Sequence, residues 1–365
     1  MASIDKLPTG KYRARWREFP NGPQKYRTFA RKIDAGRFLT EIAHGLQRGT
    51  YVDPRAGETT LAEYTPDFLA RRSHRGATSE RTERELRLHI LPAFGGWPLL
   101  AIKRANIERW AAGLPLAPSS VATVTQTLSS ILSGAVEDGR LPNNPATKAQ
   151  LPRINRPPLV PLTVDEVVKF VRGFPAHVRG AAALAAGTGL RQGEAFGLSL
   201  DRVNFLRREL RVDRQLWTPD KGSAVLVAPK SQRSYRTIAL SDTTVDALAA
   251  HLAQFGPGDD DLIFHQPSGR PILRGVLNAY VRKAASSAGV EGRTWHDFRH
   301  HHASLLLSEG ISPALVAERL GHDLKTLLRT YSHVIRSDDD RVRAVLDGAF
   351  TDRAESFLSP SEGQA

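Results

Sequence analysis

The chemistry that this sequence offers lies in five basic or imidazole side chains and one tyrosine, all in the second half of the chain. They are Arg191, Lys230, His296, Arg299, His322 and Tyr331. Guanidinium groups bind phosphate oxygens with paired donors, and imidazole and ammonium groups transfer protons. A tyrosine hydroxyl has a solution pKa of ~10, so it attacks phosphorus only beside a base or in strongly positive surroundings. Together these side chain types suit phosphoryl transfer through a tyrosine.

Each of these residues also has an ordinary structural explanation when it is taken alone. Arg191 stands where a turn enters a predicted helix, and Glu194 three residues later is a partner for a surface ion pair. A lysine at a hairpin tip, as predicted for Lys230, is normally solvated. Tyr331 alone is most simply a partly buried aromatic. The chemical interpretation therefore depends on whether the six side chains converge in space.

Two other kinds of site are less well supported by the same segments. The glycines of 187–193 are spaced G-x-G-x-x-x-G without a following Walker lysine, so we reject a nucleotide loop there. His300, His301 and His302 are successive, so on a helix they splay around the axis and cannot all bind one metal ion. A zinc site that uses His296, His300 and a remote carboxylate stays open as a weaker alternative.

The order and spacing of the six residues resemble the signature of the tyrosine recombinases, the phage integrase family. The matching segments are T-G-L-R-x-x-E at Arg191, Lys230 on a hairpin, His296-x-x-Arg299, Leu320-Gly321-His322, and Tyr331 nine positions later. The resemblance implies catalysis by these six residues with Tyr331 as the nucleophile. It also implies an α+β catalytic domain, and a homotetramer on double-stranded DNA with core and arm sites. The His301-His302 pair departs from the family pattern, which puts only local packing in doubt.

The residue types suggest a role for each member of the set. We expect Arg191 and Arg299 to clamp the phosphate, His322 to bind one of its oxygens, and Lys230 to protonate the leaving 5′-hydroxyl. His296 is the expected acceptor of the tyrosine proton. No metal and no ATP are implied, because a phosphotyrosyl link conserves the energy of the broken bond.

Other functional classes remain in competition. Residues 304–320 resemble a helix-turn-helix, so a non-catalytic DNA-binding regulator is one alternative. It does not explain why the six residues occur together. A type IB topoisomerase would share the chemistry, but a basic N-terminal module favours recognition of a second set of sites. A metal nuclease predicts a carboxylate cluster, and the sequence offers no convincing one.

The elements that must position these residues fall into several predicted domains. Thr163-Val164-Asp165-Glu166 reads as a capping box, which opens the catalytic domain. Strands are predicted at 209–212, 224–227 and 235–240. The predicted division is 1–57 for an arm-type DNA-binding domain, 58–146 for a helical core-binding domain, 147–162 for a linker, 163–346 for the catalytic domain and 347–365 for a tail. The fold class is thus multidomain and mainly α with small β parts.

The N-terminal domain is expected to be a three-stranded sheet plus one helix. Residues 11–16 and 25–29 alternate in the strand manner around a Pro-Asn-Gly-Pro turn, and 35–46 has helical spacing. Basic residues interleaved with aromatic ones suit a sheet in a DNA groove, although a solvated hairpin explains them equally well. The expected DNA-binding residues, in this domain and beyond it, are Lys11, Arg13, Arg15, Trp16, Arg17, Lys25, Arg27, Arg71, Arg72, Arg75, Arg153 and Arg156.

The composition agrees with a nucleic-acid partner. The 365 residues include 51 Lys and Arg against 38 Asp and Glu, a net charge of +13. Such an excess favours an extended anionic partner. There is no cysteine, which excludes disulfides and thiolate chemistry, and the polar start predicts no signal peptide. We expect a cytoplasmic, nucleoid-associated protein of a bacterial host, assisted by a host bending protein and a directionality factor.

Overall fold

The structure is a computed structural model that describes residues 2–19, 21–47, 56–71, 76–155, 159–219, 222–229, 231–332 and 339–351. The chain divides into two compact units, 1–156 and 157–365, and the division falls within the predicted linker. The finer predicted division stays a prediction. Within the described ranges, no helix has both the length and the apolarity needed to cross a bilayer.

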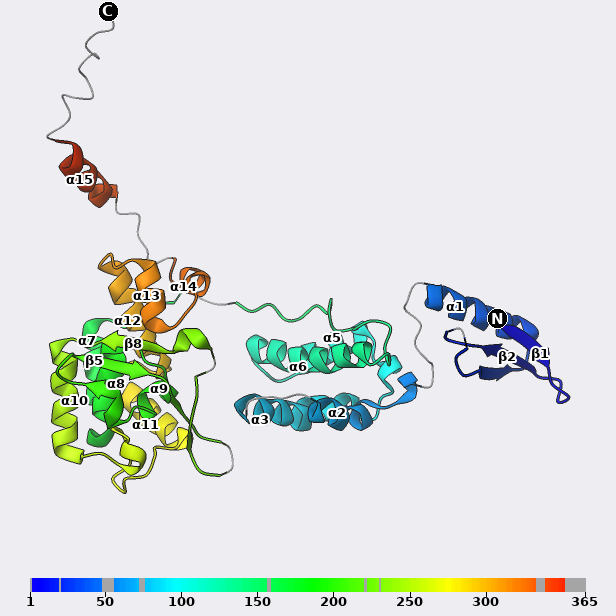
Figure 1. The fold of residues 1–365 in the computed structure, drawn as a ribbon, viewed down its shortest axis with the longest axis horizontal. Helices are drawn as coiled ribbons and strands as arrows, with labels where there is room; N and C mark the ends of the chain where they lie inside the picture. The colour runs from blue at the N-terminus through cyan, green and yellow to red at the C-terminus, as the bar shows by residue number, and fades with distance from the viewer. Residues whose placement is uncertain are drawn as a thin grey trace, which may run out of the picture. The chain divides into compact units, whose positions relative to one another are not determined.

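The N-terminal part of the first unit is an antiparallel sheet with one helix packed on it (Figure 1). Its elements are β1 (Ser3–Lys6), β2 (Tyr12–Trp16), β3 (Lys25–Phe29) and α1 (Lys32–Gln47). Ala14 and Trp16 are buried and alternate along β2 with half-buried neighbours, and the Trp16 ring meets Phe38 of α1 edge-on at 5.1 Å between centroids. The predicted sheet and helix are therefore confirmed.

The rest of the first unit is helical. It contains α2 (Leu61–Ala70), α3 (Gly76–Glu85), a π-helical turn (Leu86–Ile90), α4 (Leu91–Phe94), α5 (Arg104–Gly113) and α6 (Pro118–Glu137). Short 3-10 turns cover Ala56–Glu58 and Leu99–Ala101. Apolar residues at helical spacing, among them Tyr64, Ile90 and Leu128, share one buried core. Thr60 caps α2 with its side chain, and Glu63 closes the capping box.

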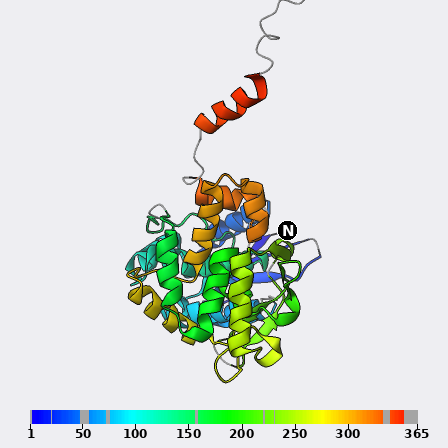
Figure 2. The ribbon, with the colours of Figure 1, turned by 90° about the vertical axis from the view of Figure 1, so that its left-hand side faces the viewer.

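The second unit packs helices around small sheets (Figures 1 and 2). Its helices are α7 (Val164–Arg172), α8 (Ala176–Thr188), α9 (Gln192–Phe196), α10 (Asp242–Phe255), α11 (Arg274–Ser287), α12 (His296–Ser308), α13 (Pro313–Leu320), α14 (Leu324–Tyr331) and α15 (Asp339–Phe350). Short 3-10 turns cover Leu200–Arg202, Gln232–Ser234 and Asp259–Asp261. The capping box predicted at Thr163 and Glu166 is confirmed, since each residue binds the backbone N–H of the other.

Two antiparallel sheets lie within this unit. One has the order β4 (Val203–Asn204), β5 (Glu209–Val212) and β8 (Arg236–Ala239), and the other pairs β6 (Gln215–Trp217) with β7 (Val225–Val227). The three predicted strands correspond to β5, β7 and β8, whereas β4 and β6 were not predicted from the sequence. Helices α12, α13 and α14 gather at one end of the unit (Figures 1 and 2). There they build a small core that includes Ala303, Leu320 and Tyr331.

Candidate active site

Arg191 lies at the junction between two helices, as predicted. Helix α8 ends at Gly189, whose φ of 68° is left-handed and favours glycine, and Arg191 then caps α9. The Arg191 backbone N–H donates to Glu194 Oε2 at 2.9 Å, and its guanidinium Nη1 donates to Glu194 Oε1 at 2.8 Å. The predicted pair between Arg191 and Glu194 is therefore confirmed, and it fixes the direction of the guanidinium.

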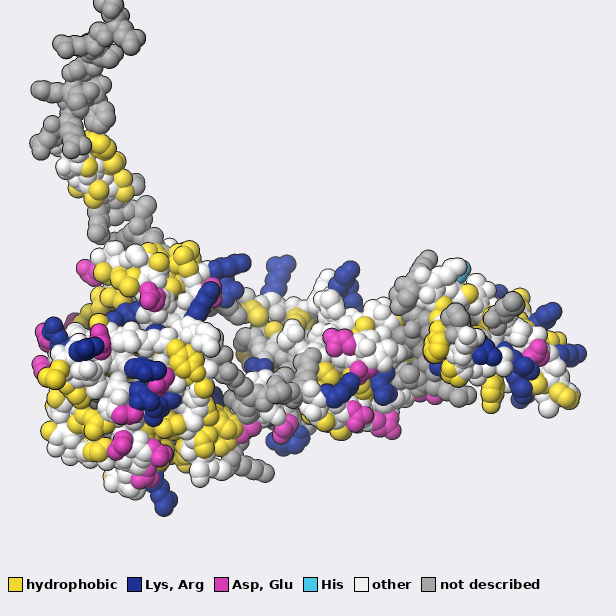
Figure 3. Space-filling model, in the orientation of Figure 1, with side chains coloured by type: hydrophobic (Ala, Val, Ile, Leu, Met, Phe, Trp, Pro, Cys, Tyr) yellow, Lys and Arg dark blue, Asp and Glu magenta, His cyan; other side chains and the backbone are white. Residues whose placement is uncertain are grey.

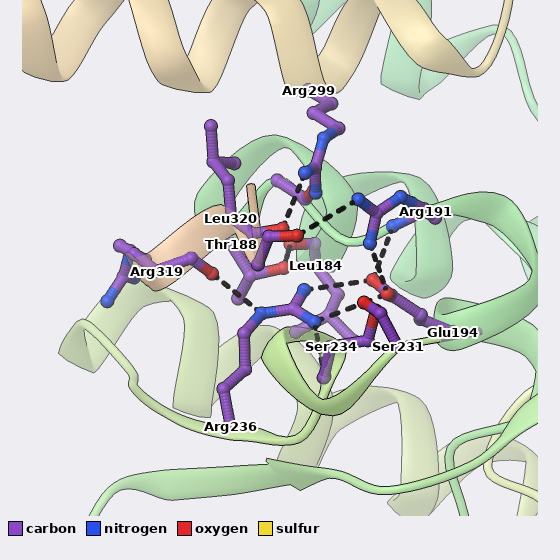
Figure 4. A network of polar contacts seen from close by, with 12 residues as sticks. Leu184, Thr188, Arg191, Glu194, Ser231, Ser234, Arg236, Arg299, Arg319 and Leu320 are labelled. Carbon is purple, nitrogen blue, oxygen red and sulfur yellow. Dashed lines mark hydrogen bonds and ion pairs between the residues drawn. The ribbon is translucent and has the colours of Figure 1, made fainter. Parts of the chain in front are cut away.

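Glu194 also receives a second guanidinium (Figure 4). Arg236, the first residue of β8, donates to both carboxylate oxygens, with 2.9 Å from Nη2 to Oε2. Burial alone would raise the pKa of Glu194, but the hydrogen bonds and charge of Arg236 and the charge of Arg191 lower it to about 2. Glu194 is therefore a permanent anion that holds two arginines in place.

Arg299 on α12 is completely buried, with a relative exposure of 0%. Its guanidinium donates to the backbone oxygens of Gly189, at 2.7 Å, and Leu320. Its Nε has no hydrogen-bond partner among the described residues. Burial, followed by the charge of nearby Arg191, lowers the pKa of Arg299 to about 9, so the group still carries its charge at neutral pH. A buried cation that is bonded to neutral carbonyls attracts an anion.

His296 and His322 are electrostatic neighbours of both arginines. Desolvation by the surrounding protein, followed by the charges of His300, Arg299 and Arg191, lowers the pKa of His296 to about 4. Part of the His296 side chain is nevertheless exposed to solvent. Burial and the same two arginines lower the pKa of His322 to about 3. Both imidazoles are therefore neutral at pH 7. The buried Nδ1 of His322 has no partner within the described part of the chain.

Tyr331 ends α14 and is 1% exposed. Burial raises the pKa of Tyr331 to about 12, although the positive charge of Arg299 acts against this rise. Its hydroxyl is 2.8 Å from Nδ1 of His300. Five of the six predicted residues thus gather at one end of the unit. Lys230, the sixth, lies outside the described residues, in the connection between Pro229 and Ser231.

Several residues that shape this site were missed by the sequence analysis. Arg236 is one of them, and Arg319 is another: its Nε donates to Nε2 of His302 at 3.1 Å. His301 and His302 each place Nδ1 against a backbone oxygen, of Leu162 and Ala186 respectively. The three successive histidines therefore reach three different partners, as the helical arrangement predicted. The sequence could not predict these contacts, because the partners of His301 and His302 lie more than a hundred residues away along the chain.

The comparisons with known proteins agree with this geometry. Residues 161–337 match the model of the phage integrase family. A prophage phiRv2 integrase of Mycobacterium tuberculosis is 27% identical over 91% of this chain and 92% of its own length. A XerC-like tyrosine recombinase of Caldanaerobacter subterraneus is 26% identical, over 85% of this chain and 88% of its own. This chain is a tyrosine recombinase of the phage integrase family.

Solved integrases share the fold of the recombinase. A Tn1549 transposon integrase in complex with circular intermediate DNA has a TM-score of 0.68, with 20% identity, and covers 80% of this chain and 99% of its own. A lambda integrase dimer bound to a core site has a TM-score of 0.59, with 19% identity, and covers 91% of this chain and 94% of its own. A lambda integrase tetramer bound to a Holliday junction is also similar, with a TM-score of 0.57 and 20% identity over 89% of this chain and 94% of its own.

The N-terminal residues expected to bind DNA divide between the two faces of the sheet. Arg13 and Arg15 pair with Thr28 and Tyr26 on β3, and by the strand alternation these side chains lie on the face away from α1. Arg15 also pairs with Asp5 at 2.6 Å. Lys11 is exposed just before β2, and Arg17, just after it, binds the backbone oxygen of Gly22. Figure 3 shows several Lys and Arg side chains on this module.

Trp16, Lys25 and Arg27 belong to the helix-facing side of the same strands. Trp16 is 5% exposed, so its ring packs in the module and is not available to stack on DNA. Arg27 lies over the rings of Phe29 and Phe38. Lys25 pairs with Glu18 at 2.5 Å. These contacts favour a structural role for the three residues, and for Trp16 they correct the expected role.

The remaining basic candidates are only partly described. Arg71 binds the Asp138 carboxylate with two nitrogens, and Asp138 also accepts the Tyr64 hydroxyl at 2.6 Å. Arg71 therefore joins the end of α2 to the end of α6, although half of its side chain stays exposed. Arg153 is exposed in the linker. Arg72, Arg75 and Arg156 lie outside the described residues.

Proposed function

We propose that this recombinase cleaves and rejoins DNA strands at specific sites through a 3′-phosphotyrosyl intermediate on Tyr331. The proposal rests mainly on one observation, the excess of positive charge around Arg299, where Arg191, Arg236 and Arg299 face the single anion Glu194. The Arg299 guanidinium is buried, its Nε is free of hydrogen bonds among the described residues, and Arg191 lies close enough to lower its pKa. A phosphate that becomes pentacoordinate concentrates negative charge on its non-bridging oxygens, which such a site stabilises.

The roles follow from these surroundings. Arg191 and Arg299 bind the non-bridging oxygens, and each well-placed donor contributes roughly 3–4 kcal/mol to transition-state stabilisation. His322 directs its unpartnered Nδ1 to the same phosphate, and the neutral His296 completes the site. Lys230 protonates the leaving 5′-oxygen. The reaction requires neither a metal ion nor ATP, since two arginines supply the charge and the tyrosyl ester keeps the bond energy.

The proposed assembly is supported by the similarity to the lambda integrase tetramer bound to a Holliday junction. Four copies bind two double-stranded DNA partners at core sites, while the N-terminal sheet binds arm sites, to integrate or excise a mobile element such as a phage. A host bending protein and a directionality factor complete the complex, in the cytoplasm of a bacterial host. Helix α15 carries an exposed apolar stripe (Figure 3), formed by Val342, Val345, Leu346 and Phe350. We propose that this stripe docks on a neighbouring copy, so deletion of residues 341–365 should abolish cooperative assembly.

A strand-exchange assay tests the function. The substrates are two duplexes that carry the attachment sequences found at the junctions of the element that encodes the chain. The full-length chain should recombine them in the presence of EDTA, and the Tyr331→Phe variant should bind both duplexes but recombine neither. Recombination by Tyr331→Phe, or its loss with EDTA, would refute the proposal. A DNA-binding regulator predicts no strand exchange by either protein.

A further inference from the structure

The Tyr331 hydroxyl has a partner that the six-residue signature does not include. Nδ1 of His300 lies 2.8 Å from the phenol oxygen, and the two rings are 5.8 Å apart between centroids. His300 comes directly after Arg299 on α12, and the phenol oxygen is the atom that attacks phosphorus in the proposed function. His300 therefore touches a reacting atom.

The direction of this hydrogen bond follows from the two protonation states. Burial raises the pKa of Tyr331 to about 12, so the phenol keeps its proton at neutral pH. Burial first, and then the charges of Arg299 and Arg293, lower the pKa of His300, while Asp297 acts in the opposite direction. His300 is therefore neutral. The phenol O–H donates to the Nδ1 lone pair, and the imidazole proton lies on Nε2.

The neighbouring histidines do not share this arrangement. Nδ1 of His301 faces the backbone oxygen of Leu162, and Nδ1 of His302 faces that of Ala186. A carbonyl oxygen only accepts, so these two nitrogens carry protons and cannot receive one. Within the run of three, His300 alone presents an acceptor nitrogen to a hydroxyl.

His296, the residue from which proton acceptance was expected, lies beside this pair. Its ring meets that of His300 edge-on at 4.6 Å between centroids. Among the described residues no hydrogen bond joins His296 to Tyr331, whereas His300 already accepts a hydrogen bond from the hydroxyl that must lose its proton. His296 thus has His300 and both arginines as neighbours, and we assign it to the phosphate and not to the phenol.

We infer that His300 is the general base for Tyr331; this inference rests on the proposed function. The Tyr331 O–H proton moves to His300 Nδ1 while the phenol oxygen forms its bond to phosphorus. The bond from phosphorus to the 5′-oxygen breaks, and that oxygen takes a proton from a separate acid. In the rejoining step the 5′-hydroxyl attacks phosphorus, and the leaving phenolate recovers its proton from His300.

The timing of the proton transfer follows from the same surroundings. The buried phenol holds its proton far more tightly than the imidazole would, so transfer must accompany attack on phosphorus. The titratable and charged groups that face His300 are Tyr331, His296, Asp297, Arg299 and Arg293. The pH profile of cleavage should therefore report the pKa of His300, which lies below its ordinary value.

The test is the single-turnover rate of covalent adduct formation between pH 5.5 and 9, with a nicked suicide duplex that carries the core sequence of the element. For the unaltered chain, the rate of adduct formation should rise with pH and become constant above the pKa of His300. His300→Gln keeps an acceptor for the phenol but cannot take its proton. It should be slower by roughly 100-fold or more at pH 7, and its rate should rise with hydroxide concentration up to pH 9.

Two further variants separate the base from a structural role. His301→Gln makes the same substitution one position away, at a nitrogen that donates to the Leu162 oxygen, and should keep the pH profile of the unaltered chain. His300→Ala should regain activity when free imidazole is added, which a merely structural defect would not do. A His300→Gln rate within threefold of the unaltered chain with the same pH profile overturns the inference alone. No adduct from the unaltered chain overturns the proposed function as well.

Discussion

Glu194→Gln tests how the arginine site is held together. The substitution keeps the size of the side chain but removes the anion between Arg191 and Arg236. The pKa of Glu194 is about 2 against an ordinary 4.5. This difference corresponds to ~3 kcal/mol of preference for the ionised form in the folded chain. Removal of one partner of a buried ion pair costs ~3–5 kcal/mol, which agrees in size.

We therefore expect Glu194→Gln to lower the free energy of unfolding of the second unit by about 3 kcal/mol at pH 7. Because the folded pKa is depressed, this contribution is complete above about pH 4.5 and disappears as the pH falls toward 2. The difference between the two proteins should accordingly be smaller at pH 3 than at pH 7. Urea unfolding followed by tryptophan fluorescence, to which the buried Trp295 contributes as one of the five tryptophans, measures both values.

A matched control is available in the same unit. Glu166 occupies the same third position of a capping box, at the start of α7, but it is only partly buried. Glu166→Gln keeps the cap, and no buried guanidinium depends on the Glu166 carboxylate. It should therefore lower the free energy of unfolding much less than Glu194→Gln does. Equal losses for the two variants, or a loss below ~1 kcal/mol for Glu194→Gln, would show that the buried carboxylate does not hold the site as described.

Two further substitution pairs probe other parts of the account. Gly189→Ala would place a Cβ 2.6 Å from Leu320 Cδ2, whereas Gly289→Ala, at nearly the same φ, meets nothing within 4 Å. In thermal or urea unfolding, Gly189→Ala should therefore lose ~1–3 kcal/mol more than Gly289→Ala, and equal losses would contradict the packing described. On a duplex with arm sites, Arg15→Ala should reduce the salt dependence of binding by about one released counterion, and Arg27→Ala should not. An unchanged slope for Arg15→Ala would argue against the outer face of the sheet as the DNA surface.

Local signals made much of the fold predictable. The capping box of Thr163 and Glu166 predicted the start of α7. The alternation of polar and apolar residues in β2 predicted a sheet with one buried face. Strands β4 and β6 could not be predicted, because they have two and three residues and are too short for an alternation of polar and apolar residues to show. The π-helical turn at Leu86–Ile90 leaves the helical apolar spacing almost unchanged, so it has no clear signature.

The proposed catalytic set could be chosen from the sequence because its residue types and order are specific, although the sequence alone could not show which of the side chains meet. The supporting contacts were not predictable in the same way. Arg236 reaches Glu194 over 42 residues, and His300 reaches Tyr331 over 31 residues. His300 meets the phenol because α12 and α14 contribute to the same small core, which is a property of the tertiary structure. Trp16 was misassigned because an aromatic residue within a basic strand looks the same whether it faces the helix or DNA.

The central claim is that the Tyr331 oxygen becomes bonded to DNA. The direct measurement is to trap the covalent complex on a nicked suicide duplex, digest both components and identify the modified peptide by mass spectrometry. The account predicts a nucleotide attached through its 3′-phosphate to Tyr331, and no adduct with Tyr331→Phe. An adduct on another residue, or an undiminished adduct with Tyr331→Phe, would contradict it.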